Sequence, residues 1–480
     1  MMKRVLAIDQ GTTATKTYTL DTAGRFAFCN SVEHRQIYPQ PGWVEHDPET
    51  LLRNVQDSIE AANDIYAIGI DNQGETVIAW NSESGLPVYN AIVWQDRRTT
   101  DFTEELKARG AEEITLKRAG LPLDPYFSAS KLRWILKNIP ETQKLLRKKR
   151  LRIGTSESFF IYRLTGEYAT DVTTASRTSL MNLKTCNWDP ELCELFEIPI
   201  ETLPEIRTTT GYFGTLKSKR RDIPVTASVV DQQAALMGHG CYEAGQIKAS
   251  FGTGVFALAN VGHSVQSDHA GGILSTVAWQ FAKEKPVYAV DAGVYNAGSA
   301  VNWIKKLGLF NEFGEIDHFE NSAAVSRGLV FVPALSGLAC PFWDRSAAGL
   351  WLGMSLESTK DDLCQAVLEG IAFRTAQLLD AMARLTGEQR KLYVDGGLIN
   401  NSYFCQFLAD VTQCEIVVPA SPDITTYGTG RFALIGSGLV KQPSELPPAE
   451  KPQAIVTPQK DLARFKERFN EAINRSRNWR

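Results

Sequence analysis

Residues 4–20 read RVLAIDQGTTATKTYTL and decide the fold, because two β-prone runs flank a turn of Gly and Thr. A second stretch of the same design, IKASFGTGVFALA, occupies residues 247–259. Glycine lets the backbone of such a turn approach a ligand closely, and threonine adds hydroxyl donors that suit phosphate. Since the two turns lie about half a chain apart, we expect two similar domains that hold one polyphosphate between them.

The composition is that of a globular protein. A chain of 480 residues is too long for one hydrophobic core, so two domains are expected. The hydrophobic content of 43% and the charged content of 22% are ordinary values. A net charge of −4 gives no reason to expect nucleic acid as a partner.

The cysteines and the apolar runs indicate the cellular compartment of the protein. The eight cysteines are scattered and form no Cys-x-x-Cys pair, which favours reduced thiols in the cytoplasm. The first residues reach an aspartate too early for a signal peptide. No run of 18 apolar residues occurs, so no membrane span is expected. We therefore expect a soluble cytoplasmic protein.

Strands and helices alternate along the chain, as in α/β proteins. Strands are expected within 4–20, 65–80, 247–259, 287–291, 329–333 and 391–394. Helices are expected at 48–63, over most of 101–150, and at 231–239, 297–307, 360–387 and 401–412. The predicted division is a first domain of residues 1–243, a second of residues 244–440, and a peripheral extension of residues 441–480 that ends in an amphipathic helix.

Several common site motifs are absent. The first turn resembles a P-loop, but Thr15 takes the place of the second glycine. No Gly-x-Gly-x-x-Gly follows a strand, no His or Cys set has zinc spacing, and Gly-x-Ser-x-Gly is missing. The candidate functional residues that remain are acidic residues, Thr, Gly and Trp, which suit phosphoryl transfer to a polar small molecule.

Two separate motifs resemble the signatures of the FGGY carbohydrate kinases. Residues 126–138, YFSASKLRWILKN, match the first signature at every position. The second is matched by GLWLGM at 349–354, followed by DLCQAVLE at 362–369. The DQGTT start and the DGG at 395–397 agree, and the resemblance covers roughly residues 3–440. It implies two actin-like, ribonuclease-H-type domains with ATP and a polyol or sugar in the cleft between them.

Within this family the chain is most similar to the glycerol kinases. Segments that carry this likeness are PGWVEHDP at 41–48, NAIVWQDRRT at 90–99, ASRT at 175–178 and DQQAA at 231–235. The resemblance implies phosphorylation of a primary hydroxyl of a small polyol, glycerol to glycerol 3-phosphate. By position, the polyol contacts would be Glu75, Trp94, Tyr126, Asp231 and Phe256. Trp and Phe can pack the carbon chain, while carboxylates and a phenol take the hydroxyls.

One departure from the glycerol kinases bears on the substrate. In those enzymes an arginine that binds the polyol precedes the glutamate that is Glu75 here, and this chain has Gly74 in its place. Loss of a guanidinium removes hydrogen-bond donors and is expected to open space in the pocket. Val230, before Asp231, also stands where a glycine is typical. A kinase for a longer polyol or a ketose, such as erythritol, ribulose or xylulose, is therefore the alternative.

The roles at the reaction centre follow from the resemblance and from elementary chemistry. Asp231 lies at the expected start of a helix, whose dipole favours the ionised carboxylate, so it can accept the proton of the attacking hydroxyl. The structural alternative is that Asp231 only caps the helix. Asp9, at the end of the first strand, is expected to hold Mg²⁺ through water.

The nucleotide is expected to contact both domains. Thr12, Thr13 and Lys16 would face the β- and γ-phosphates from the first domain, and Thr253 from the second. Positions that hold adenine and ribose in the family are matched by Gly298, Asn302, Gly397 and Asn401. Lys16 could instead be an exposed strand lysine, and the glycines could serve turns that need positive φ.

The sequence also allows two functions from other classes of protein. An actin- or chaperone-like ATPase would share the fold but need no polyol pocket, and a sugar-binding regulator would have lost catalysis. The partners expected are ATP and a small polyol or sugar, with a homodimer as the assembly to test and no nucleic acid or membrane.

Overall fold

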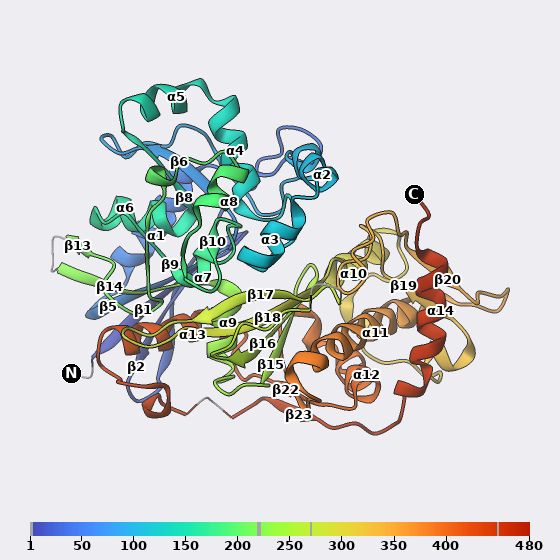
Figure 1. The fold of residues 1–480 in the computed structure, drawn as a ribbon. Helices are drawn as coiled ribbons and strands as arrows, with labels where there is room; N and C mark the ends of the chain where they lie inside the picture. The colour runs from blue at the N-terminus through green and yellow to red at the C-terminus, as the bar shows by residue number, and fades with distance from the viewer. Residues whose placement is uncertain (1–2, 218–221, 269–270, 449–450) are drawn as a thin grey trace.

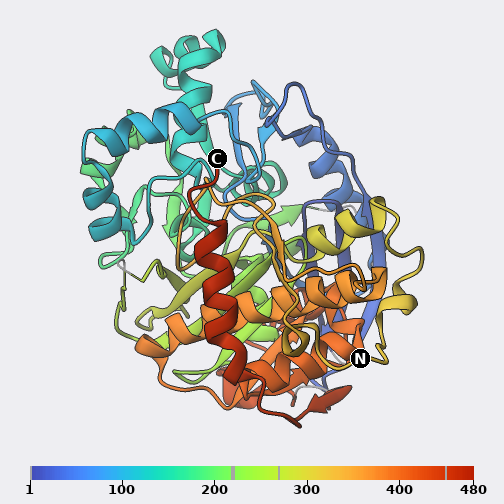
Figure 2. The ribbon, with the colours of Figure 1, turned by 90° about the vertical axis from the view of Figure 1, so that its right-hand side faces the viewer.

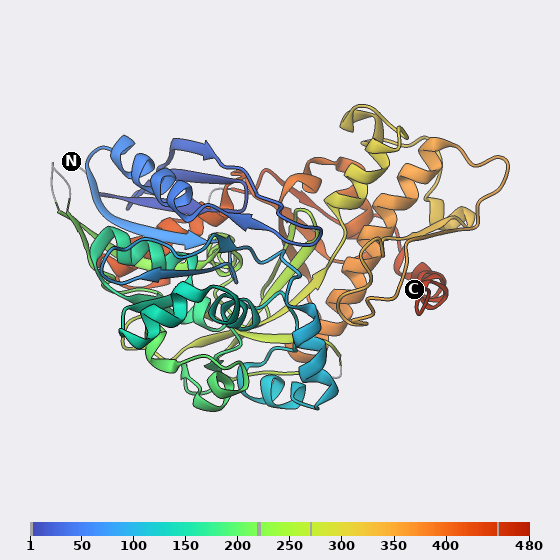
Figure 3. The same ribbon diagram turned by 90° about the horizontal axis from the view of Figure 1, so that it is seen from above.

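The computed structural model describes residues 3–217, 222–268, 271–448 and 451–480. Figure 1 shows two domains, one built by the N-terminal half of the chain, blue to green, and the other by most of the C-terminal half, yellow to red. Viewed from above in Figure 3, the two domains lie side by side. The two-domain α/β architecture expected from the sequence is confirmed.

The first domain is built on a six-stranded sheet with the order β13-β14-β5-β1-β2-β3. Strands β1 and β2 form the hairpin around the first Gly-Thr turn, and β5 and β14 run parallel to β1. The strands are β1 (Arg4–Gln10), β2 (Ala14–Asp21), β3 (Phe26–Glu33), β5 (Ile65–Asn72), β13 (Thr215–Lys217) and β14 (Asp222–Val230).

The second domain repeats this topology in its seven-stranded sheet, with the order β17-β18-β16-β15-β21-β22-β23. Strands β15 and β16 form the hairpin around the second turn, and β21 and β22 run parallel to β15. The strands are β15 (Ile247–Phe251), β16 (Val255–Gly262), β17 (Leu274–Trp279), β18 (Val287–Val294), β21 (Lys391–Asp395), β22 (Glu415–Val418) and β23 (Ala454–Val456). The recurrence of the turn in the sequence therefore marks a repeated fold.

Helices cover the sheet of the first domain on both faces. On one face lie α1 (Pro48–Ala61) and α6 (Ser156–Thr165), and on the other α9 (Asp231–Gly238) and α13 (Ile424–Gly436). Helix α1 begins where the sequence predicts, because Asp47 caps it by accepting a hydrogen bond from the N–H of Glu49, and Pro48 supplies the fixed φ of a first helical residue.

A smaller sheet and a group of helices enlarge the first domain. The sheet has the order β4-β7-β6-β8, and the helices lie beside it in the upper part of Figure 1. The elements are β4 (Glu45–His46), β6 (Val77–Asn81), β7 (Ala91–Ile92), β8 (Leu151–Thr155), α2 (Thr100–Ala108), α3 (Glu112–Ala119), α4 (Ser128–Asn138) and α5 (Pro140–Arg147). The mostly helical content predicted for 101–150 is thus confirmed.

The second domain packs its helices on one face of its sheet. They are α10 (Gly298–Lys306), α11 (Lys360–Thr386) and α12 (Ser402–Thr412), and α14 (Lys466–Ser476) packs outside them against α11. Helix α11 is buried over most of its length, and its buried residues include Val367, Leu368 and Ile371. The other face of the sheet, at Leu258 and Ala289, joins the apolar cluster of α9 and α13. One core therefore runs between the domains.

The predicted limits of the domains are modified in two places. Helix α13, which the sequence reasoning did not identify, belongs to the second half of the chain but packs on the sheet of the first domain. In the extension of residues 441–480, β23 joins the second sheet and α14 buries Phe469 in the core. Figure 2 shows α14 as the red helix that lies across the orange helices. This segment is integrated rather than peripheral. The division between residues 243 and 244 falls in the loop before β15 and stays a prediction.

Among the residues that the structure describes, no helix combines the length and the apolar character that crossing a bilayer requires.

Candidate active site

The first Gly-Thr turn is held tightly between β1 and β2. The N–H of Gly11 donates to the carbonyl of Ala14 at 3.0 Å, which closes the turn. The N–H of His34 donates to the carbonyl of Thr13, and a ring nitrogen of His34 lies 3.1 Å from the carbonyl oxygen of Thr12. The hydroxyl of Thr12 accepts a hydrogen bond of 3.1 Å from Nε1 of Trp94, which ties the turn to a predicted polyol contact and leaves the hydroxyl proton free to donate.

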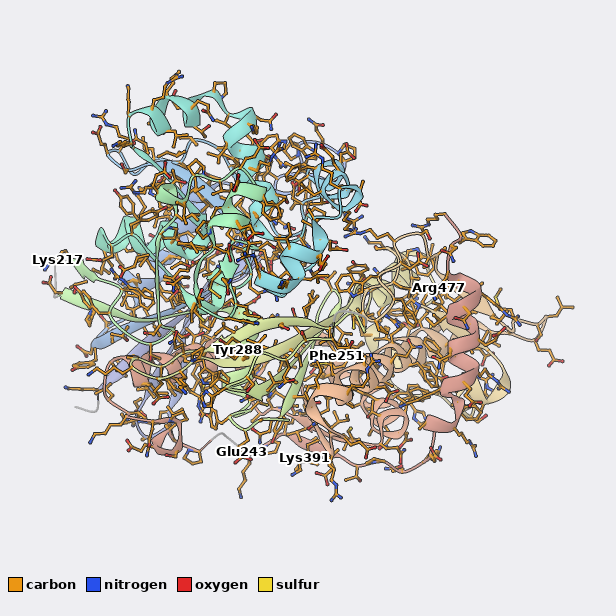
Figure 4. The ribbon with its side chains drawn as sticks, viewed as in Figure 1. Lys217, Glu243, Phe251, Tyr288, Lys391 and Arg477 are labelled. Carbon is orange, nitrogen blue, oxygen red and sulfur yellow. The ribbon has the colours of Figure 1, made fainter. Side chains whose placement is uncertain are left out.

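The second turn is fixed against the start of α10. The N–H of Gly298 donates to the carbonyl of Gly252 at 2.9 Å, and the N–H of Ala297 donates to the carbonyl of Thr253 at the same distance. A Cβ at Gly254 would lie 2.4 Å from the carbonyl oxygen of Val294, so only glycine fits there. The turn follows Phe251, labelled in Figure 4 at the end of β15.

A cavity of about 550 Å³ lies beside the second turn. Its wall includes every residue of the second domain that the sequence assigned to the nucleotide: Thr253, Gly298, Asn302, Gly397 and Asn401. The N-terminus of α10 and the 3₁₀ turn at Gly397–Asn400 border it, and the first N–H groups of α10 donate to the carbonyls of the second turn. The five residues predicted from separate segments are therefore brought together.

Two predicted nucleotide contacts already have protein partners. Asn401 caps α12, because its side-chain oxygen accepts from the N–H of Phe404 at 2.7 Å and its amide donates to the carbonyl of Ile316. Lys16 lies across from Asp9 in the β1–β2 hairpin, and its ammonium forms an ion pair of 2.7 Å with Asp423. Its predicted contact with phosphate stays a prediction.

A second cavity, of about 310 Å³, lies between the domains and has an aromatic wall. Trp94, Tyr126 and Phe256, all predicted polyol contacts, line it. The ring of Trp94 meets those of Tyr126 and Phe256 edge-on, with centroids 5.8 and 6.3 Å apart. Thr253 lines both cavities, so the two cavities meet at the second turn.

Tyr126 is positioned by a buried cation. The ammonium of Lys131 donates to the carbonyls of Pro125, Tyr126 and Phe127, which clamps the chain at the start of α4. Burial lowers the pKa of Lys131 to about 8. Because three carbonyls converge on one ammonium, Tyr126 is held in the cavity wall, although its phenol makes no hydrogen bond to any residue that the structure describes.

Glu75 is the predicted polyol contact with the most constrained backbone. It is buried, and its φ of 61° lies in the left-handed region that non-glycine residues rarely adopt. Its carboxylate accepts a hydrogen bond of 2.7 Å from Nε of Arg177, and its carbonyl accepts one from Ser128. A strained, buried carboxylate held by an arginine is typical of a functional site.

The expectation that Gly74 opens space in the pocket is wrong. A Cβ at position 74 would lie 2.6 Å from Cγ2 of Val230, so the side chain of Val230 fills the space beside Gly74. The two departures noted in the sequence are therefore one steric arrangement. Gly74 does not have positive φ, which in this loop belongs to Glu75.

Asp231 is the first residue of α9, but the helix dipole does not keep the pKa of its carboxyl low. The pKa of Asp231 is raised to about 7, mainly by burial and then by the nearby carboxylates of Glu75 and Asp9, while Lys248 opposes the rise. Burial outweighs the helix dipole here. Val230, rather than Asp231, is the N-cap residue, and the carboxylate accepts only from the N–H of Gln232.

Asp9 has an acidic neighbour that the sequence reasoning missed. In the parallel register of β1 and β5, Asp9 lies opposite Asp71, whose carboxyl is buried and accepts a hydrogen bond from Thr429. Burial and the proximity of Asp9 hold the pKa of Asp71 well above its usual value. The signal was present, because parallel strands bring their carboxyl ends to one edge. Arg177 was also missed, since only its place in a motif was noted.

The geometry defines a class of protein: two domains of one topology, each with a Gly-Thr turn in its first hairpin, and two cavities that meet at the second turn. Family models agree. The N-terminal domain of the FGGY family of carbohydrate kinases matches residues 4–238, and its C-terminal domain matches residues 247–436. The chain belongs to this family and is a carbohydrate kinase, a phosphotransferase with an alcohol group as acceptor.

Relatives of the chain cover its full length. It is 37% identical to the glycerol kinase of Chloroflexus aurantiacus, over 100% of both chains. It is also 37% identical to that of Thermococcus kodakarensis, over 100% of this chain and 98% of the relative. The crystal structure of Plasmodium falciparum glycerol kinase with ADP superposes with a TM-score of 0.90 at 32% identity, covering 99% of this chain and 98% of the other.

A more distant structure shares the fold. The ligand-bound xylulose kinase of Lactobacillus acidophilus superposes with a TM-score of 0.87 at 24% identity, covering 99% of this chain and 97% of the other.

Proposed function

We propose that this kinase transfers the γ-phosphoryl group of ATP to a primary hydroxyl of glycerol and forms glycerol 3-phosphate. The observation that carries the proposal is the meeting of two cavities at Thr253, one walled by predicted nucleotide residues and the other by Trp94, Tyr126 and Phe256. The full-length similarity to glycerol kinases supports glycerol as the acceptor. Val230 beside Gly74 supports it too, because the expected extra space is filled.

The polyol would be bound by packing and by hydrogen bonds. Trp94 and Phe256 would pack its carbon chain, and Glu75 and Tyr126 would take its hydroxyls. Asp231 would accept the proton of the reacting hydroxyl as that oxygen attacks the γ-phosphorus. Its pKa of about 7 suits this role, because the group is substantially ionised at neutral pH and still basic enough to bind a proton.

The nucleotide would lie across both turns. Thr12 and Thr13 would contact the β- and γ-phosphates from one side and Thr253 from the other. Gly298, Asn302, Gly397 and Asn401 would border the adenine and ribose. Lys16 would reach the phosphates by exchanging its partner Asp423 for them. Closure of the domains would then exclude water from the γ-phosphate.

The carboxylates at the edge of the first sheet fit magnesium. Asp9 faces the first turn, and Oδ1 of the neighbouring Asp71 is buried without a hydrogen-bond partner. Mg²⁺ is commonly held by one or two carboxylates together with water and substrate phosphates, and Asp9 and Asp71 are two such carboxylates in paired positions of β1 and β5. When bound, Mg²⁺ would neutralise phosphate charge, and Asp9 would orient its water ligands.

The size of the polyol cavity favours a second candidate. Its volume of about 310 Å³ leaves room for a fourth or fifth carbon, so a kinase for erythritol, ribulose or xylulose is the alternative. The assay of ADP release with each of these acceptors, with glycerol and with no acceptor decides between them. We expect glycerol to give the highest kcat/KM. A higher value for another acceptor, or equal ADP release without any acceptor, would overturn the proposal.

The homodimer and the cytoplasmic location stay predictions from the sequence.

A further inference from the structure

An arginine that no part of the proposed mechanism uses lies in the wall of the polyol cavity. Arg177 follows the short helix α7 (Val172–Ala175), and its side chain is 5% exposed. Its Nε donates to Glu75 at 2.7 Å, and its Nη1 lies 2.9 Å from a carboxylate oxygen of Asp291 on β18. The guanidinium also lies 5.9 Å from the centre of the Tyr126 ring. Arg177 thus joins both domains and two predicted polyol contacts.

The guanidinium retains hydrogen-bonding capacity. Although Nη1 is close to Asp291, it makes no hydrogen bond of acceptable geometry, and Nη2 donates to no residue that the structure describes. A buried guanidinium has five donors, and leaving them unpaired costs free energy. The side chain faces a cavity rather than a filled core. Oxygen atoms of a bound molecule are the partners that this arrangement lacks.

The surrounding charges select a neutral ligand. Glu75 and Asp291 already compensate the single positive charge of Arg177, and Asp231 adds a further carboxyl nearby. An anionic acceptor, such as a sugar acid, would meet excess negative charge at this wall. A neutral hydroxyl can accept a hydrogen bond from Arg177 and donate one to Glu75 at the same time.

The position of Arg177 is fixed from both sides of the cleft. The preceding Ser176 has its hydroxyl oxygen 2.8 Å from that of Thr276 on β17, in the second domain. The segment also contributes Val172 and Ala175 to an apolar cluster that includes Met181 and, from the second domain, Tyr288. Because the segment is anchored to both domains, the guanidinium is pre-positioned before a ligand arrives.

We propose that Arg177 is a substrate-binding and specificity-determining residue that, together with Glu75, binds the hydroxyls of the polyol that are not phosphorylated. This inference rests on the proposed function and extends it to the groups that recognise the acceptor. An acceptor that lacks one of these hydroxyls should therefore be a poorer substrate than glycerol only while Arg177 is present. The reason is that a site built to bond a hydroxyl rejects analogues that lack it.

The test compares three acceptors in two variants. Glycerol, propane-1,2-diol and propane-1,3-diol are assayed with the wild-type enzyme, with Arg177→Gln and with Arg177→Lys. We expect the preference for glycerol over at least one diol, measured as a ratio of kcat/KM values, to fall about tenfold or more in Arg177→Gln. Arg177→Lys should keep an intermediate preference for glycerol, because a single ammonium replaces the several N–H donors of the planar guanidinium. Arg133→Gln, which breaks the surface pair with Glu197, is the matched control.

Other outcomes separate a structural role from the proposed one. If Arg177 only ties the domains together, its variants lower kcat/KM for glycerol and both diols by the same factor, and the proposal is overturned. If Arg177→Gln does not fold, Arg177→Lys carries the same comparison. If the wild-type enzyme phosphorylates erythritol in place of glycerol, only the proposed function fails. Erythritol and butane-1,2,4-triol, which lacks one internal hydroxyl, then test Arg177.

Discussion

A Cβ placed on Gly74 would lie 2.6 Å from Cγ2 of Val230, closer than any ordinary contact between carbon atoms. Gly74 precedes the strained Glu75, and Val230 precedes Asp231, so two residues beside the reaction centre are mutually constrained. Val230 is also tied at its N–H to the hydroxyl of Thr173 and is therefore not free to withdraw. This pair fixes the packing directly beside Glu75 and Asp231.

The steric pair predicts a coupled effect on stability. Gly74→Ala should destabilise the protein by about 1–3 kcal/mol, because it overpacks the contact with Val230. Val230→Ala should relieve most of that cost, so the double variant is more stable than the sum of the two single changes implies. Chemical denaturation of the four proteins measures the coupling. If the changes in the free energy of unfolding of the two single variants simply add up in the double variant, the contact between position 74 and Val230 is absent.

The same pair bears on any attempt to place an arginine before Glu75. Gly74→Arg alone should lose stability and polyol affinity, since its Cβ meets the same obstacle as that of alanine. Combined with Val230→Gly, it should fold normally. Thermal melting followed by glycerol kinetics gives the comparison. A well-folded Gly74→Arg single variant with improved glycerol affinity would contradict this account.

Removal of the proposed base should stop chemistry without stopping binding. Asp231→Asn is expected to lower kcat by about two to four decades, the scale of general acid–base catalysis, while nucleotide affinity is retained. Steady-state kinetics and calorimetric titration with ADP measure the two effects. Asp380→Asn, which breaks an exposed pair with Lys466, is the control. Near-normal turnover in Asp231→Asn would leave Asp231 a structural role only.

The raised pKa of Asp231 predicts how activity and stability depend on pH. Only the ionised carboxylate accepts a proton, so kcat/KM should fall as the pH drops below about 7. The pKa is higher in the folded than in the unfolded state, so the stability contributed by the protonated form is complete at low pH and lost as the pH rises through 7. Asp231→Asn should therefore raise the melting temperature at pH 8 and change it little at pH 4. A larger increase in melting temperature at pH 4 than at pH 8 would contradict a raised pKa of Asp231.

Closure of the domains predicts protection of both turns. With glycerol and a non-hydrolysable ATP analogue together, the amides of residues 9–16 and 252–254 should exchange more slowly than with either ligand alone. Hydrogen-exchange mass spectrometry follows the turns, and small-angle scattering follows the overall dimensions. No compaction and no added protection with both ligands present would rule out closure.

The sequence by itself determined the elements whose residues are neighbours in the chain. The Gly-Thr turns, the hairpins around them and the start of α1 at Pro48 depend on local backbone preferences, so the pattern was sufficient to predict them. The spacing between the turns also predicted the repeated domains. The family resemblance then assigned residues such as Trp94 and Phe256, which do line one cavity.

Only the tertiary structure decided how residues far apart act on one another. Arg177 reaches Glu75 from 102 positions away, and helix α13 returns from the second half of the chain to cover the first sheet. The raised pKa of Asp231, the pairing of Asp9 with Asp71 and the filling of space at Gly74 by Val230 likewise depend on burial and strand register. Hydrophobic pattern and turn chemistry fix local conformation, but desolvation, charge proximity and steric fit arise only when separate segments are packed together.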